Sequence, residues 1–114
     1  MPSDRMRRVN EAIREVLSDA TNKGLKDPRV GFVTVTEVDT SPDLRHATVF
    51  VSVLGTPEER AASLEGLQSA HGYLQRRVGS ELRLKRTPAL DFAHDDTALR
   101  AARLNALIDE EGHS

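Results

Sequence analysis

Apolar side chains recur every three or four residues in two long stretches of this chain, as they do on one face of an α-helix. The first stretch begins after Ser3, a residue type that caps helices, and stops before Gly24. Its stripe consists of Met6, Val9, Ala12, Ile13, Val16, Leu17 and Ala20. The second stretch begins at a capping box in residues 56–59 and is expected to stop at Gly79. Its stripe consists of Ala61, Leu64, Leu67, Ala70, Leu74 and Val78.

The second helical stretch contains the step Ala70-His71-Gly72. A glycine inside a helix lowers the stability of the helix by about 1 kcal/mol relative to alanine. The apolar stripe itself gives no sign of an interruption at this position. We therefore expect two helices that meet at a sharp kink. The small side chains of Ala70 and Gly72 would allow close approach by another helix or by a nucleic-acid phosphate. The alternative interpretation is that Ala70 and Gly72 are small only because two helices cross there.

Short segments rich in Val and Thr separate the helical stretches. Residues 32–38 and 47–53 read as two antiparallel strands, joined by turn-forming residues at 40–43. A third, shorter strand is expected at 88–92, and Thr97 can cap a last helix that reaches Ile108. The order is helix, strand, strand, kinked helix pair, strand, helix.

The composition fits one soluble domain. The chain has 114 residues and no linker, so we expect a single domain over 1–114, with a core at about 4–108 and frayed residues at 109–114. It has no Cys, which excludes disulfides, cysteine zinc sites and thiol nucleophiles. Neither a membrane span nor a signal peptide is visible, and we expect a cytoplasmic protein.

Charge is segregated along the sequence despite a net charge of -2. Residues 66–90 carry five basic side chains against one acidic side chain, whereas residues 31–65 and 91–114 are acidic. The five cations are Arg76, Arg77, Arg83, Lys85 and Arg86. Two interpretations are open: these cations form a stripe that contacts phosphates, or they are solvated charges at a helix end.

Two further sets of candidate residues are weaker. Arg5, Arg7 and Arg8 lie on the outer face of the first helix, where acidic neighbours at helical spacing can pair with basic side chains. His71 at the kink could stack on a base or donate to a phosphate, or it could be a partly exposed helix residue.

The order of elements resembles the type II KH fold, an α+β fold with a three-stranded sheet and helices on one side, extended here by a C-terminal helix. The residues resemble one family, ribosome-binding factor A. The segments that carry the resemblance are Lys26-Asp27-Pro28-Arg29, residues 33–38 and 41–44, Val49-Phe50-Val51-Ser52, Ala70-x-Gly72-Tyr73-Leu74, Leu82-x-Leu84-Lys85, Pro88-x-Leu90-x-Phe92 and Asp96-Thr97. They span about residues 5–108 in family-like order.

The resemblance implies a factor that binds the immature small (30S) ribosomal subunit, contacts 16S rRNA late in assembly and leaves before translation. In this family an Ala-x-Gly kink replaces the Gly-x-x-Gly loop of other KH domains, and Ala70 and Gly72 match it. Such a kink offers fewer free backbone N–H groups, so side-chain cations should carry more of the phosphate contact. The sequence departs from the family at Ala101-Ala102, where a glycine is expected, which weakens any role assigned there.

Other residues are expected to be structural. Asp27-Pro28-Arg29 and Asp43 have turn chemistry, so we expect them to shape loops more than to contact a partner. The three phenylalanines are expected in the core, which argues against a stacking platform and favours recognition of RNA shape and backbone.

Two alternatives stay open beside the RNA-binding hypothesis. A metal-dependent hydrolase could use Asp91, His94, Asp95 and Asp96, but the acidic pair is also what a helix N-terminus favours, so we expect neither metal, cofactor nor enzymatic activity. A generic KH-like adaptor would instead bind RNA or protein away from the ribosome. An assembly GTPase is an open second partner, and the lack of an obvious exposed apolar stripe favours a monomer.

Overall fold

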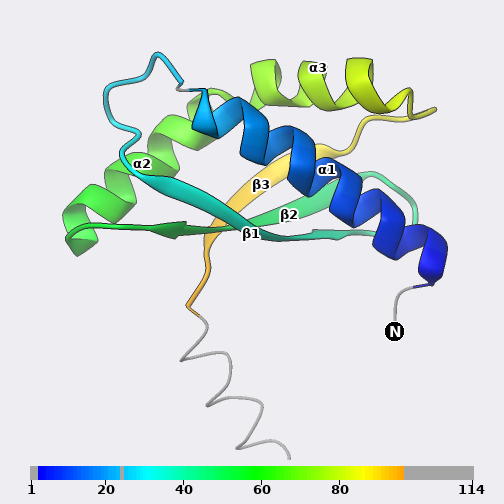
Figure 1. The fold of residues 1–114 in the computed structure, drawn as a ribbon, viewed down its shortest axis with the longest axis horizontal. Coiled ribbons are helices and arrows are strands. Elements are labelled where there is room, and N and C mark those ends of the chain that lie inside the picture. Colours follow the sequence, from blue (N-terminus) through cyan, green and yellow to red (C-terminus); the bar gives the residue numbers. More distant parts are fainter. Residues whose placement is uncertain (1–2, 24, 97–114) are drawn as a thin grey trace, which may run out of the picture.

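The computed structural model of the chain describes residues 3–23 and 25–96 and shows the α-β-β-α-α-β order that the sequence predicts (Figure 1). The elements are α1 (Asp4–Asn22), β1 (Val33–Thr40), β2 (His46–Val53), α2 (Pro57–Ser69), α3 (His71–Leu82) and β3 (Ala89–His94). The helix predicted after Thr97 lies outside the described residues.

The three strands form one sheet in the order β1-β2-β3. β1 pairs antiparallel with β2, as predicted, and a bulge between Val35 and Glu37 shifts the register. β3 pairs parallel with β2, with Ala47 opposite Leu90 and Val49 opposite Phe92. A parallel pair needs a long crossover, and α2 and α3 supply it.

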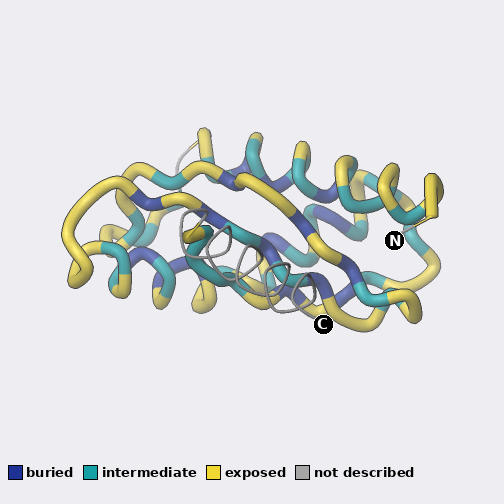
Figure 2. The backbone as a smooth tube through the Cα atoms, turned by 90° about the horizontal axis from the view of Figure 1, so that it is seen from below, coloured by how far each residue is buried: buried dark blue, intermediate teal, exposed yellow. Residues whose placement is uncertain are grey.

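The described helices all cover the same face of the sheet (Figure 1), which confirms the predicted α+β, KH-like arrangement. Buried and less buried residues alternate along β2 (Figure 2), so one side of this strand enters the core and the other does not. The core consists of Ile13, Leu17, Ala20, Val35, Val38, Ala47, Val49, Val51, Val53, Leu67, Leu74, Val78 and Leu90.

The two predicted helix starts that fall within the described residues are both present. The hydroxyl of Ser3 accepts the N–H of Met6 at 3.1 Å at the start of α1. At the start of α2, the Thr56 hydroxyl accepts the N–H of Glu59 at 3.1 Å, and the Glu59 carboxylate accepts the N–H of Thr56 at 3.2 Å. These capping bonds satisfy N–H groups that have no partner within the helix.

The prediction that Gly79 ends the second helical region is wrong. α3 continues to Leu82 and ends at Arg83, which has a left-handed backbone with φ of 50° and donates its N–H to the Gly79 carbonyl at 3.2 Å. A Cβ at position 79 would lie 2.5 Å from the hydroxyl oxygen of Thr87. Gly79 therefore allows a close approach inside the helix instead of stopping it.

The expectation that all three phenylalanines are buried is wrong for Phe32, which is 82% exposed. Phe92 is half-buried and packs against the core. Phe50 is also half-buried, but among the described residues it belongs neither to the core nor to the apolar side chains packed against it, so the expectation is wrong for Phe50 too. Leu54 lies beside Phe32, to whose carbonyl its N–H donates at 3.1 Å, and it is 78% exposed. Phe32 and Leu54 thus form a small exposed apolar pair, and the monomeric state stays a prediction.

Candidate nucleic-acid interface

The kink between α2 and α3 is present, and it is centred on Ala70. This residue has φ of -89° and ψ of 5°, and it ends one helix and precedes the next. Its N–H is shared between the carbonyls of Gly66 at 3.1 Å and Leu67 at 3.0 Å. Its own carbonyl accepts the N–H of Leu74 at 3.0 Å, so backbone bonding continues across the bend.

Gly72 is not required by packing within the described chain. A Cβ at this position would meet one neighbouring atom, an Arg76 guanidinium nitrogen, at 3.8 Å, which is an ordinary contact with a flexible side chain. At Gly66, by contrast, a Cβ would lie 2.6 Å from a methyl carbon of Val30. The close approach expected at the kink therefore occurs at Gly66 and Gly79, and the surface beside Gly72 is open.

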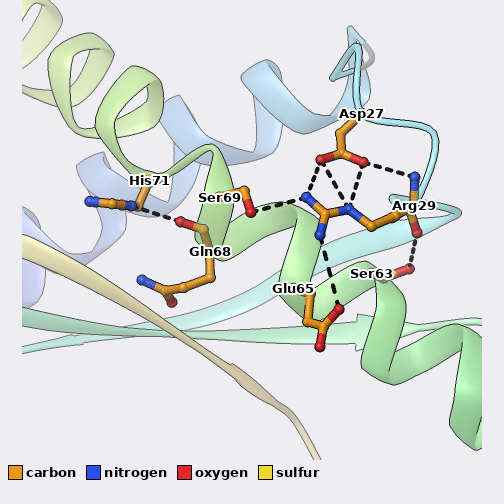
Figure 3. Close-up of polar contacts among 7 residues, drawn as sticks. All are labelled: Asp27, Arg29, Ser63, Glu65, Gln68, Ser69 and His71. Carbon is orange, nitrogen blue, oxygen red and sulfur yellow. Dashed lines mark hydrogen bonds and ion pairs between the residues drawn. The ribbon is translucent and has the colours of Figure 1, made fainter.

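His71 and Gln68 contact each other at the kink (Figure 3). The exposed His71 ring lies with Nδ1 2.7 Å from the Gln68 carbonyl, where it satisfies a carbonyl in the last turn of α2. The Gln68 amide donates to the Leu90 carbonyl and accepts the Phe92 N–H, each at 3.3 Å. Gln68 thus ties the kink to the edge strand β3, a role that a polar residue on a helix surface does not reveal in sequence.

The loop after α1 is anchored on α2 by Arg29 (Figure 3). Its guanidinium donates to both carboxylate oxygens of Asp27, at 2.6 Å for the shortest bond, and to the Ser69 hydroxyl at 3.0 Å. Another of its nitrogens lies 4.0 Å from Glu65. Hydrogen bonds from the Arg29 side chain and backbone lower the pKa of Asp27 to about 2. These contacts support the structural role expected for Asp27 and Arg29.

Arg77 differs from the other cations of the basic stretch. Its guanidinium donates to Glu81 at 3.1 Å on the same helix and to Asp19 at 3.2 Å on α1, and its side chain is only 22% exposed. Hydrogen bonds with Glu81, Tyr73 and Asp19 raise its pKa. The charge of Arg77 is therefore used within the fold, where it joins α3 to α1.

The remaining four cations of the stretch are uncompensated. Arg76, Arg83, Lys85 and Arg86 are all exposed, and within the described ranges none of them forms an ion pair. Arg76 also lines an open groove of about 320 Å³ with Gly72, Gln75 and Thr87. The structure therefore places free positive charge beside the open surface at Gly72.

The arginines of α1 are divided in the same way. Arg7 lies 3.6 Å from Asp4, whereas Arg5 and Arg8 are exposed and have no ion-pair partner in the part of the chain that the structure describes. Arg14 pairs with Glu11. α1 and α3 contact each other and run in opposite directions (Figure 1), so the start of α1 and the end of α3 lie toward the same end of the molecule.

The sheet carries the opposite charge. Its three strands contain no Lys or Arg, but they contain Glu37, Asp39 and Asp91. The described Lys and Arg side chains therefore all lie on helices and loops. A polyanion would be attracted to the helical side of the molecule and repelled by the strands.

The metal-site alternative gains no support from the geometry. Asp95 accepts the Thr36 hydroxyl at 2.7 Å, so it is engaged in holding the end of β3 to β1. Among residues 3–23 and 25–96, no group of three or more His, Asp or Glu side chains could hold a metal ion. Within the same ranges, no helix has the length and apolar character needed to cross a membrane.

Comparison with known structures finds the same fold in ribosome-binding factor A structures from two organisms. A Thermotoga maritima protein solved by NMR and named as a candidate ribosome-binding factor A has a TM-score of 0.74 and 38% identity, covering 84% of this chain and 92% of that one. The crystal structure of Thermus thermophilus ribosome-binding factor A gives 0.68 and 25%, covering 78% and 94%. A homology model of the Thermus factor, fitted into a cryo-EM map of its 30S complex, gives 0.62 and 26%, covering 74% and 88%.

Sequence comparison points to the same family. Ribosome-binding factor A of Halothermothrix orenii is 43% identical over 108 residues, covering 95% of this chain and 88% of its own length. The Halorhodospira halophila factor is 49% identical over 107 residues, covering 93% and 85%. The family model for ribosome-binding factor A matches residues 5–108. The chain therefore belongs to the ribosome-binding factor A family.

Proposed function

We propose that this protein binds the immature 30S subunit with its kinked-helix side against 16S rRNA, assists late maturation of that RNA and dissociates before translation. It acts in the cytoplasm by binding alone, without a cofactor and without catalysing a reaction. The observation that carries the proposal is the set of four exposed cations, Arg76, Arg83, Lys85 and Arg86, which form no ion pair among residues 3–23 and 25–96.

The open surface at Gly72 supports the same face. No packing contact among the described residues requires glycine at position 72, although a glycine weakens a helix relative to alanine. Close approach of an RNA backbone to α3 would use it, since a phosphate could then lie against the helix within reach of Arg76. Most of the binding energy would come from cations that replace the counterions of the phosphates.

The proposal that the partner is the small subunit comes from what is known of a relative. The Thermus thermophilus factor, whose fold this chain shares, has been fitted into a map of a 30S complex. The acidic strands favour the same orientation, because they would repel RNA from the other face of the sheet.

Co-sedimentation tests the proposal with small subunits, large subunits and assembled ribosomes. The double variant Arg76→Glu/Lys85→Glu should abolish selective binding to small subunits. A matched control, Lys23→Glu/Arg45→Glu, changes the net charge equally but lies outside the basic stretch, and it should bind like the wild type.

The competing function, an adaptor that binds protein through its acidic strands, predicts the opposite result. Its binding would survive Arg76→Glu/Lys85→Glu and would be lost on substitution of Asp39 and Asp91. Equal loss of small-subunit binding in Arg76→Glu/Lys85→Glu and in the control Lys23→Glu/Arg45→Glu would show that net charge alone matters. That result would contradict an interface at the kink.

A further inference from the structure

A groove of about 550 Å³ lies between the loop after α1 and the kink. It is lined by Leu25, Lys26, Asp27, Ser69, Ala70 and Tyr73. Pockets of this size hold small organic ligands, and they commonly combine apolar walls with a few polar groups. The proposed interface at Arg76 and Gly72 does not include this groove.

Tyr73 gives the groove a flat aromatic surface. Its side chain is 45% exposed, although it belongs to a helix whose inner face is buried at Leu74 and Val78. Leu25 and Ala70 supply apolar surface beside it. An aromatic ring that stays accessible between apolar side chains suits a planar ligand, which can stack on the ring.

The charge around the groove favours an anionic ligand. Two charged residues, Lys26 and Asp27, line it. The Asp27 carboxylate is neutralised by Arg29 through its short hydrogen bonds, whereas Lys26 is exposed and has no ion pair in the described part of the chain. The uncompensated charge at the groove is therefore positive.

Tyr73 lies between this groove and the exposed cation Arg76. The same residue lines a second, shallower groove of about 320 Å³ with Arg76, Arg77, Ser80 and Glu81. Tyr73 and Arg76 are one helical turn apart, so they project on the same side of α3. A chain of nucleotides whose phosphate meets Arg76 can therefore place its next base against Tyr73.

We infer that the groove binds one unpaired RNA base, which stacks on Tyr73 while Lys26 contacts an adjoining phosphate. This inference rests on the proposed function and adds a base-binding subsite to it. The subsite accepts a single base, which distinguishes it from the multi-aromatic platforms that the sparse aromatic content argues against. The groove supplies stacking for the base, and the exposed cations Arg76, Arg83, Lys85 and Arg86 supply positive charge to the phosphates.

The sequence offers a direct probe, because Tyr73 is its single tyrosine and it has no tryptophan. We would titrate the protein with an adenine RNA heptamer and follow the tyrosine ring protons by NMR. The control is an abasic heptamer with the same sugar-phosphate backbone. The adenine heptamer should shift the ring resonances upfield and the abasic heptamer should not. Equal shifts with both, or no shift with adenine at millimolar concentration, would overturn the inference.

Variants at position 73 separate this inference from the proposed function. Tyr73→Phe should bind small subunits like the wild type, whereas Tyr73→Leu should bind about fivefold or more weakly, because aliphatic side chains stack poorly. The salt dependence of Tyr73→Leu should stay unchanged, since no phosphate contact is lost, whereas Lys26→Ala should reduce it. Wild-type binding by Tyr73→Leu, together with loss in Arg76→Glu/Lys85→Glu, would refute the base subsite and leave the proposed function intact.

Discussion

The Arg77 guanidinium lies 3.2 Å from the Asp19 carboxylate, across the contact between α3 and α1. The adjacent Arg76 is exposed and has no ion pair in the described ranges. Two neighbouring arginines therefore have different tasks. One holds two helices together, and the other is free to meet a phosphate.

Arg77→Ala and Arg76→Ala should separate stability from binding. Loss of Arg77 leaves Asp19 and Glu81 without this partner, so the melting temperature should fall by a few degrees. Loss of Arg76 should leave the melting temperature unchanged and weaken small-subunit binding. Thermal unfolding and binding measured on the same preparations check both, and a reversed pattern would contradict the assignment.

Binding should depend strongly on salt. If Arg76, Arg83, Lys85 and Arg86 each neutralise one phosphate, the logarithm of the binding constant should fall with the logarithm of salt concentration with a slope of about -3. Replacing any one of them with Ala should reduce the magnitude of the slope by about 0.7. Titration at several salt concentrations measures it. A slope near zero would rule out the electrostatic mechanism.

Gly66 and Gly72 should respond oppositely to substitution by alanine. Gly66→Ala forces a Cβ against the stiff Val30 side chain at 2.6 Å and should lower the free energy of unfolding by about 1–2 kcal/mol. Gly72→Ala meets no such contact and should raise it by up to about 1 kcal/mol. Chemical denaturation measures both changes.

Binding by the Gly72 variants tests what the open surface is for. Gly72→Val places a bulkier, branched side chain at the kink and should weaken small-subunit binding more than Gly72→Ala does. If both variants bind and fold like the wild type, then the small side chain at the kink has no role in recognition.

The Asp27–Arg29 contact should make stability depend on acid pH. The pKa of Asp27 is lowered from 3.8 to about 2, so the stabilisation is complete above about pH 4 and is lost as the pH falls through about 2. Wild type should therefore be more stable than Asp27→Asn near neutrality, and the difference should shrink toward pH 2. Thermal unfolding across this range measures it. A difference that is constant with pH would contradict the assignment.

Local patterns predicted the helices and the caps well. The stripe that includes Ile13 and Leu17, and the capping box at Thr56 and Glu59, depend on residues close in sequence. The position of the kink at Ala70 follows from the same local reasoning.

Features that depend on distant residues could not be predicted in this way. Arg77 meets Asp19, which is 58 residues away, and the Gln68 amide meets β3. Gly79 looked like a helix stop because its neighbour Thr87 is not visible from the helix sequence. The basic stretch was found from charge alone, but its division into paired and free arginines required the fold.

Site-directed crosslinking tests the central claim, that the helical side of the molecule meets 16S rRNA. The chain has no Cys, so single-cysteine variants accept a photoreactive group at one position. Ser80→Cys places it on α3 in the groove lined by Arg76, and Ser52→Cys places it on an exposed position of β2. In complexes with small subunits, we expect crosslinks to 16S rRNA from position 80 and few or none from position 52. Crosslinks from position 52 in place of position 80 would contradict it.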